Sequence, residues 1–219
     1  MRAARSCTRP PLSVRLARAV NRQAAAPHGA FGRLLGAIWR REHARVNAEA
    51  VARLDVQPGQ DVLEVGFGPG EALREVVRRS QGGSVLGLDV SEVMVGLARR
   101  RNRGAVARGV LEVRRIDGAE LGLDGRSFDR ILSVHCVYFW RDLDGMLAQL
   151  AGSLRPGGRL LLAYRPEGDD IPARFRDPTY RFPRPERLEE QLRRAGLAAA
   201  RTVSAPGLPG VVFTLAERG

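Results

Sequence analysis

The sequence predicts an α/β fold built on seven strands, which form a mostly parallel sheet with an antiparallel last strand and helices on both faces. Three observations predict it. Beyond residue 58, short apolar runs alternate with helical segments, the pattern of a parallel sheet with helical crossovers. A glycine-rich turn follows the first apolar run. The last two apolar runs are separated only by residues 205–210, too few for a helical crossover, so that pair is expected to be antiparallel.

Each element of the alternating part has a local signal. The expected strands are apolar runs at residues 61–66, 84–89, 111–116, 128–135, 159–164, 199–204 and 211–216. The expected helices lie at residues 70–80, 91–103, 143–154 and 186–195. Ser91 is expected to cap the second helix, because a serine side chain accepts hydrogen bonds from the free amides of a helix N-terminus.

The chain before residue 58 is organised differently. Residues 1–26 form a basic segment, and residues 27–57 are expected to form a helical lid. The main helix of the lid is expected over Ile38–Leu54, behind a glycine-containing patch at residues 27–32 that separates it from an earlier helical stretch. Residues 165–185 hold five prolines and little pattern, so we expect a long loop there. The domain itself is expected to span residues 27–219.

Composition excludes several classes of protein. The apolar runs are far shorter than the roughly 20 residues that span a bilayer, so no membrane span is expected. The two cysteines, Cys7 and Cys136, and the three histidines, His28, His43 and His135, show no disulfide or metal-ligand spacing. We therefore expect a soluble, cytoplasmic protein without a bound metal.

The net charge of +12 raises the question of a polyanionic partner. Residues 1–47 carry ten arginines and one acid, whereas residues 48–219 carry 26 arginines and 23 acids, so the excess lies in the N-terminal segment. All 36 basic residues are arginine, which is typical of a GC-rich genome, and a nucleic-acid partner is not expected. Residues 1–20 are Arg-rich and free of acids, which fits either a transit peptide or, as we favour, a variable terminus.

The strongest functional signal is the segment from Val62 to Gly70, an apolar strand followed by glycines at positions 66, 68 and 70 and then by a helix. Glycines permit a tight turn and let a ligand approach the backbone closely. The helix N-terminus adds amide donors that suit a carboxylate or a phosphate. The alternative interpretation is a plain strand-to-helix turn.

Two acids weigh against that alternative. Asp89 ends the second strand, 19 residues after Gly70, where such folds place an acid on ribose hydroxyls. Asp117 and Gly118 follow the third strand, close to where an adenine would lie. The antiparallel pair at the end of the chain supports the same interpretation.

With these motifs the chain resembles the class I S-adenosylmethionine-dependent methyltransferases, in particular a small-molecule branch similar to ubiquinone and menaquinone methyltransferases. The resemblance covers residues 27–217 and depends on four segments taken together, at residues 64–70, 86–91, 128–140 and 154–164. It implies a Rossmann-like fold and S-adenosylmethionine as the cofactor. It also implies methyl transfer to a small-molecule acceptor by in-line displacement.

The resemblance implies roles for the matched residues of the first motif. Gly66, Gly68 and Gly70 would face the methionine portion of the cofactor. Glu64 would orient the methionine amino group, directly or through water.

The resemblance likewise implies roles along the second and third strands. Asp89 would hold the ribose, and Asp117, with Gly118 beside it, would accept a hydrogen bond from the adenine amino group. Val90 and Met94 could pack against the adenine. Each carboxylate has an alternative role as a helix cap or a surface charge.

His135 departs from the pattern of the family, since relatives that share the following Tyr-Phe-Trp run often have Asn there. It ends the fourth strand, where ligands bind in open α/β sheets. It is a candidate general base near neutral pH, or else a hydrogen-bonding wall of the cofactor pocket. Tyr138, Trp140 and, in the proline-rich loop, Tyr180 are candidate substrate contacts, with Trp140 alternatively covering the cofactor. Phe139 is expected in the core.

Other functions remain open at this point. A nicotinamide-dependent dehydrogenase would carry G-x-G-x-x-G, whereas this chain carries G-x-G-x-G. An RNA or protein methyltransferase could use the Arg-rich start as its contact surface, with binding that falls steeply as salt rises. A non-catalytic regulator could retain the cofactor fold, although the intact glycines and acids argue against it.

Overall fold

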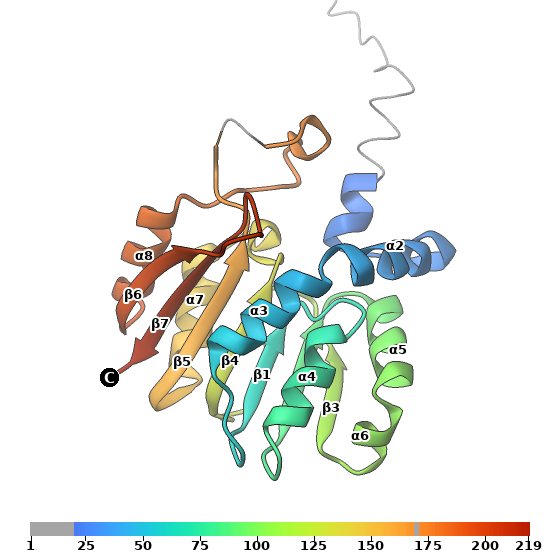
Figure 1. The fold of residues 1–219 in the computed structure, drawn as a ribbon, viewed down its shortest axis with the longest axis vertical. Helices are drawn as coiled ribbons and strands as arrows, with labels where there is room; N and C mark the ends of the chain where they lie inside the picture. Colours follow the sequence, from blue (N-terminus) through green and yellow to red (C-terminus); the bar gives the residue numbers. More distant parts are fainter. Residues whose placement is uncertain (1–19, 169–170) are drawn as a thin grey trace, which may run out of the picture.

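The structure, a computed structural model, describes residues 20–168 and 171–219 and has one sheet between two layers of helices (Figure 1). The sheet order is β3-β2-β1-β4-β5-β7-β6. Its strands are β1 (Val62–Val65), β2 (Val85–Asp89), β3 (Leu111–Arg115), β4 (Phe128–Val134), β5 (Leu154–Tyr164), β6 (Leu197–Ser204) and β7 (Val212–Arg218). β7 runs antiparallel to both of its neighbours and the remaining pairs are parallel, which confirms the predicted fold class.

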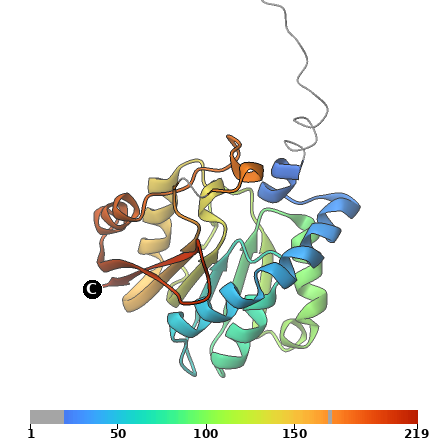
Figure 2. The same ribbon diagram turned by 45° about the horizontal axis from the view of Figure 1, so that its top comes forward.

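The helices cover both faces of the sheet, as expected. One face carries α3 (Ala44–Leu54), α4 (Glu71–Arg79), α5 (Glu92–Arg101) and α6 (Arg103–Ala107), and the other carries α7 (Leu143–Gly152) and α8 (Pro185–Arg194). α2 (Gly29–Glu42) and the 3-10 turns η1 (Val137–Phe139) and η2 (Ala173–Phe175) complete the set. α2 and the segment around η2 lie beyond the carboxyl ends of the parallel strands (Figures 1 and 2). Within the described ranges, no helix is long and apolar enough to cross a membrane.

Alternation of side chains along the strands builds the two halves of the core. On β5, Leu161 and Ala163 pack into the cluster under α3, α4 and α5, whereas Leu160 and Leu162 pack into the cluster under α7 and α8. All four residues of β1 are buried, as expected for a central strand of a parallel sheet. Burial on both faces therefore fixes the register of the strands whose carboxyl ends form the site.

The lid differs from its prediction. The helix expected over Ile38–Leu54 is two helices, because α2 ends at Glu42 and α3 begins after His43. The two helices pack on different partners, α2 on α5 and α3 on α4, β4 and β5, so the chain must turn between them. The patch at residues 27–32 separates two helices only in part, since residues 27 and 28 lie between the helical residues 20–25 and α2, while its glycines lie inside the first turn of α2. Residues 20–25 form a separate helical turn, and the expectation for residues 1–19 lies outside the described residues.

β5 also differs from its prediction, which began at Arg159. It begins at Leu154, directly after α7, and includes the Pro-Gly-Gly run that lies between the expected helix at 143–154 and the expected strand. Phe128 of β4 pairs with Leu154 and Arg130 pairs with Arg159, so the glycine-containing run is accommodated as an irregularity of the β4–β5 ladder. Ser91 caps α5 as predicted, with its Oγ accepting from Met94 N at 3.2 Å.

Candidate active site

A cavity of about 660 Å³ opens at the carboxyl ends of β1, β2 and β4. In an open α/β sheet this is the place where the strand order reverses and ligands bind, because β1 lies between β2 and β4. The lid contributes Ala24, Ala25, Ala26, Pro27, Trp39, His43 and Asn47 to its wall. Residues 24–26, expected as part of the basic terminal segment, thus belong to the wall of the cavity.

The glycine turn after β1 supplies the floor. Gly66 has φ +75°, and a Cβ added to it would lie 2.7 Å from the Cβ of Cys136, so only glycine fits between β1 and the end of β4. Gly68 lines the cavity, and a Cβ added there would meet no atom within 4 Å. These two glycines leave exposed backbone facing the space where a ligand would lie.

Gly70, which the resemblance predicts to face the methionine portion of the cofactor, lies where two helices pack together. It does not line the cavity. A Cβ added to it would lie 2.8 Å from the Cβ of Ala98, and its φ is +80°. The third glycine therefore lets α4 begin close against α5, so it has a packing role in this structure.

Asp89 lines the cavity at the end of β2, and its carboxylate organises the surrounding backbone. Oδ2 accepts from Gly68 N at 2.9 Å and Oδ1 accepts from Ser91 N at 2.8 Å. Burial raises the pKa of Asp89 to about 6, although these backbone donors oppose the shift. Each oxygen retains a further lone pair, so the side chain can also accept from two ligand hydroxyls.

Glu64 of β1 is a buried carboxylate with an unsatisfied atom. Its side chain lines the cavity, the residue is 2% exposed, and Oε2 has no hydrogen-bond partner. Burial raises the pKa of Glu64 well above its usual range, and the nearby charge of Asp89 raises it further. A buried acceptor of this kind fits a cationic donor, because pairing would remove its desolvation penalty.

The residues predicted for the adenine surround one side of the cavity. Val90, Met94, Asp117 and Gly118 all line it. Asp117 is exposed, and its Oδ1 accepts from Ala119 N at 3.0 Å, so it shapes the turn after β3 as well as facing the cavity. A Cβ on Gly118 would lie 3.0 Å from Cγ1 of Val90, which explains why the smallest residue stands there.

His135 is held in a fixed arrangement with Tyr138. The Tyr138 hydroxyl accepts from Arg165 N and lies 2.9 Å from His135 Nδ1. We assign the Tyr138 proton to the bond with Nδ1, since this assignment gives the buried hydroxyl proton an acceptor. Nε2 of His135 then carries the ring proton and is a donor.

Electrostatics reinforce the neutral form of His135. Its pKa is lowered to about 3, mainly by burial and also by the electrostatic effect of His43 and Arg165. The expected general base near neutral pH is therefore not what this environment favours. A hydrogen-bonding wall, the other role considered for His135, fits the geometry.

Sequence reasoning missed His43, which enters the cavity from the junction of α2 and α3. Its ring lies 4.6 Å from that of His135 and stacks with Trp39 at 6.5 Å, centroid to centroid. Burial lowers the pKa of His43, and the charge of Glu42 opposes that shift. The only sequence signal was a histidine beside Trp39 on one helical face, and nothing local shows what that face meets.

Aromatic side chains form the outer half of the cavity. Tyr138 and Trp140 line it while remaining mostly buried, and Tyr180 reaches it from the proline-rich loop. Tyr180 packs against Phe139 at 5.3 Å and against Phe175 at 5.4 Å between ring centroids. Phe139, expected in the core, is only half-buried and also lines the cavity because η1 turns it outward.

The Cys136 thiol near the cavity is not activated for nucleophilic chemistry. Burial raises the pKa of the Cys136 thiol to about 12, and the charge of Asp89 contributes, so this cysteine is not poised as a thiolate. Across residues 20–168 and 171–219, no cluster of three or more His, Cys, Asp or Glu side chains is placed to hold a metal.

Comparison with known proteins agrees with this site. A methyltransferase domain model matches residues 63–162. The Bacillus subtilis protein YdaC, named an uncharacterized methyltransferase, is 31% identical over 139 residues, covering 63% of this chain and 74% of that protein. A demethylmenaquinone methyltransferase of Tropheryma whipplei is 35% identical over 149 residues, covering 68% of this chain and 55% of that protein. The chain thus spans about half the length of this second relative.

Solved structures agree on the fold. An S-adenosylmethionine-dependent methyltransferase from Aquifex aeolicus superposes with a TM-score of 0.64 at 20% identity, over 78% of this chain and 88% of that one. The glycine floor, the acids at the ends of β1 and β2, and the unpaired buried oxygen of Glu64 fit S-adenosylmethionine as the cofactor. The chain therefore belongs to the class I S-adenosylmethionine-dependent methyltransferases.

Proposed function

We propose that the protein is a cytoplasmic enzyme that methylates a small-molecule acceptor, which binds in the aromatic half of the cavity. The observation that carries this proposal is the division of one enclosed space into two chemically different halves. Glycine backbone, Glu64 and Asp89 line one half, whereas rings from the lid, η1 and the proline-rich loop line the other. A cavity of about 660 Å³ is of the size that small-molecule sites occupy.

The first half would hold the cofactor through this chain's own groups. Glu64 would accept from the amino group of the methionine portion, which supplies the cation that its free Oε2 lacks. Asp89 would accept from the ribose hydroxyls while it keeps Gly68 and Ser91 in place. Val90, Met94 and the Asp117 turn would enclose the adenine.

The second half would orient the acceptor. When bound, the cofactor supplies an electrophilic methyl group on a sulfonium, so the protein's task is alignment and exclusion of water. His135 would donate a hydrogen bond from Nε2–H to an oxygen of the acceptor, and Tyr138 would hold the His135 ring in place. Trp39, Phe175 and Tyr180 would supply apolar walls.

Two other functions fit the structure less well. A large RNA or protein substrate would need its target group to enter a cavity covered by the lid and by the loop before α8. A regulator without catalysis would not need the aromatic half. The Tropheryma relative is named for a quinone-type acceptor, and this supports an apolar ring compound over a macromolecule.

A transfer assay with methyl-labelled S-adenosylmethionine tests the proposal. The protein would be incubated separately with a panel of phenols and quinols, with total RNA and with a protein extract. We expect label in the organic phase of the small-molecule samples, and much less transfer by Asp89→Ala when the cofactor is limiting. Label confined to RNA or protein would overturn the small-molecule assignment and leave the family assignment intact.

A further inference from the structure

The outer face of α2 carries three large apolar side chains in water. Phe31 is 44% exposed, Leu34 is 56% exposed and Ile38 is 42% exposed. Their spacing of three and four residues places them along one side of the helix. We call this set the α2 stripe.

The α2 stripe is not a misplaced part of the core. The inner side of the same helix, with Leu35 and Gly36, is buried against α5. A Cβ on Gly36 would lie 3.0 Å from Leu97, so the two helices are already in close contact on that side. The apolar surface of α2 therefore extends beyond what the fold needs, and exposed apolar surface of this kind marks an interaction site.

Three exposed arginines share the helix with the α2 stripe, Arg41 next to it and Arg33 and Arg40 further around the helix. Arg33, Arg40 and Arg41 lie on the same helix, are exposed, and have no ion-pair partner among the residues that the structure describes. Glu42 is the only acid in residues 20–47, against five arginines. The segment that carries the stripe therefore has a net positive charge.

We propose that the outer face of α2 docks on the surface of an anionic lipid bilayer. Phe31, Leu34 and Ile38 would enter the boundary between headgroups and acyl chains, while the arginines would lie at the level of the lipid phosphates. Amphipathic helices with an apolar side and basic flanks bind membranes in this way, parallel to the surface. An anionic leaflet also attracts each nearby arginine.

The positive charge of α2 favours an anionic bilayer over a second copy of the chain or the N-terminal segment as the partner of the stripe. A second copy of the chain, related by a twofold axis, would bring the same arginines face to face. The N-terminal residues 1–19 contain five arginines and no acid, so they are repelled by the same surface. An anionic bilayer supplies both the negative charge and the apolar depth that the stripe requires.

Docking would have a geometric consequence for the cavity. Trp39, the residue after Ile38 on the same helix, lines it, so the stripe and the cavity lie on adjacent sides of one helix. α2 and the η2 segment lie at the same end of the molecule (Figure 2). The membrane would therefore lie next to the lid. This inference goes beyond the proposed function and does not depend on it, because lipid binding requires neither cofactor nor acceptor.

Vesicle co-sedimentation of the full chain tests the proposal. Vesicles of phosphatidylcholine alone would be compared with vesicles that also contain phosphatidylglycerol. We expect binding to the anionic vesicles only, weakened by high salt. The triple substitution Phe31→Ser, Leu34→Ser, Ile38→Ser is expected to lower the partition coefficient at least about tenfold.

A matched pair of charge variants separates docking from general attraction. Arg33→Gln, Arg40→Gln, Arg41→Gln is expected to lower the partition coefficient at least about tenfold. The same charge change elsewhere, Arg74→Gln, Arg103→Gln, Arg194→Gln on exposed positions of α4, α6 and α8, is expected to change it less than about twofold. Unchanged thermal unfolding and unchanged binding of S-adenosylhomocysteine would show that all three variants are folded.

Three results would overturn the proposal. The first is wild-type protein that does not bind anionic vesicles. The second is undiminished binding by the apolar triple variant, which would mean that the stripe is irrelevant and the protein is only a polycation. The third is a wild-type dimer in sedimentation velocity that the apolar triple variant converts to monomer, which would assign the stripe to a second copy.

Discussion

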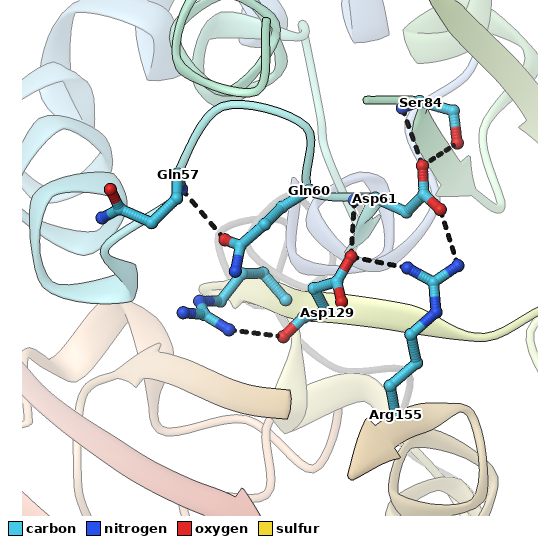
Figure 3. A network of polar contacts seen from close by, with 7 residues as sticks. Gln57, Gln60, Asp61, Ser84, Asp129 and Arg155 are labelled. Carbon is cyan, nitrogen blue, oxygen red and sulfur yellow. Dashed lines mark hydrogen bonds and ion pairs between the residues drawn. The ribbon is translucent and has the colours of Figure 1, made fainter. Parts of the chain in front are cut away.

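At the amino ends of the strands, Arg155 lies between Asp61 and Asp129 and donates to each carboxylate at 2.6 Å (Figure 3). Asp61 also accepts from the amide and the hydroxyl of Ser84, and its own amide donates to Asp129. Burial alone would raise the pKa of Asp61, but the bonds from Ser84 and Arg155 outweigh it and lower the pKa. Every carboxylate of this network is paired.

At the carboxyl ends of the same strands the arrangement is reversed. Glu64 has a buried oxygen without a partner, and the pKa values of Glu64 and Asp89 are raised rather than lowered. His135 is in the left-handed region, with φ +54°, which is uncommon for a residue with a side chain. One end of the sheet thus stabilises the fold, whereas the other retains groups that cost stability until a ligand pairs with them.

The largest expected effect is at the ligand end. Asp89→Ala should weaken binding of S-adenosylhomocysteine at least about tenfold, because two charge-assisted hydrogen bonds of about 1.5–3 kcal/mol each are lost. Calorimetry measures the affinity. His135→Asn should bind as the wild type does, and Asp117→Ala should lose less than Asp89→Ala because Asp117 is exposed. Equal affinity of wild type and Asp89→Ala would remove this carboxylate from the site.

Glu64→Gln should separate binding from stability. The amide cannot ionise, so it removes the cost of either charging a buried carboxyl or keeping it protonated, and the free energy of unfolding of the unliganded protein should rise by about 1 kcal/mol at neutral pH while ligand affinity falls. Because folding raises the pKa of Glu64, the protonated carboxyl stabilises the folded state relative to the ionised one. This contribution is fully present below the unfolded pKa and is lost as pH rises through the folded pKa. The advantage of the variant should therefore grow as pH rises. Denaturant unfolding at several pH values checks this, and a variant less stable than wild type at every pH would contradict it.

Arg155→Gln should have the opposite profile. It should lower the free energy of unfolding by about 1 kcal/mol, since its side chain is 40% exposed and solvent screens the pairs. Affinity for S-adenosylhomocysteine should not change. Because the pKa of Asp61 is lowered, its stabilising contribution is present above its unfolded pKa and lost as pH falls through the folded pKa. The variant should accordingly lose less stability than the wild type on acidification. An altered affinity for S-adenosylhomocysteine would contradict the idea that the amino and carboxyl ends of the strands act independently.

The smallest expected effect is at His135. Its ring should not titrate between about pH 5 and 8, the window of an ordinary histidine. Nitrogen-15 spectra of the imidazoles should show the neutral form with the proton on Nε2. In Tyr138→Phe the Nδ1 partner is lost, yet the ring should stay neutral because burial dominates its pKa. A His135 that titrates near pH 6.5 would restore it as a candidate base.

Sequence alone predicted the features that local patterns determine. The mostly parallel sheet with an antiparallel last pair was predicted because apolar runs, helical crossovers and the short connection before β7 are local signals, whereas the strand order comes from the structure alone. Asp89 and Gly68 could be predicted as site residues because the spacing of the glycines and the acid indicates the backbone turn that follows β1. His43 could not be predicted as a neighbour of His135, because the two meet only through the packing of α2 and α3. The role of Gly70 was also hidden, since its constraint comes from Ala98 on another helix.

The same distinction applies to charge. The sequence predicted that His135 lies at the end of β4. Its low pKa, however, comes from burial and from His43 and Arg165, two residues that lie in other segments of the chain. The helix break at His43 has no Gly or Pro signal, because it arises from two packing partners rather than from a local preference.

One carboxylate connects segments that are distant in the chain. Asp89 accepts from Gly68 and from Ser91, and the Ser91 hydroxyl donates in turn to the carbonyl of Pro27 at the start of the lid. Substitutions within one such network are not additive. In genetic terms, substitutions at positions 89 and 91, which contribute side chains to the network, are expected to be epistatic, whereas Gly68 contributes only its backbone amide. Because the anchor on the lid is a backbone carbonyl, the lid sequence can vary and keep it, whereas loss of the Ser91 hydroxyl would release the lid from the residue that would hold the ribose.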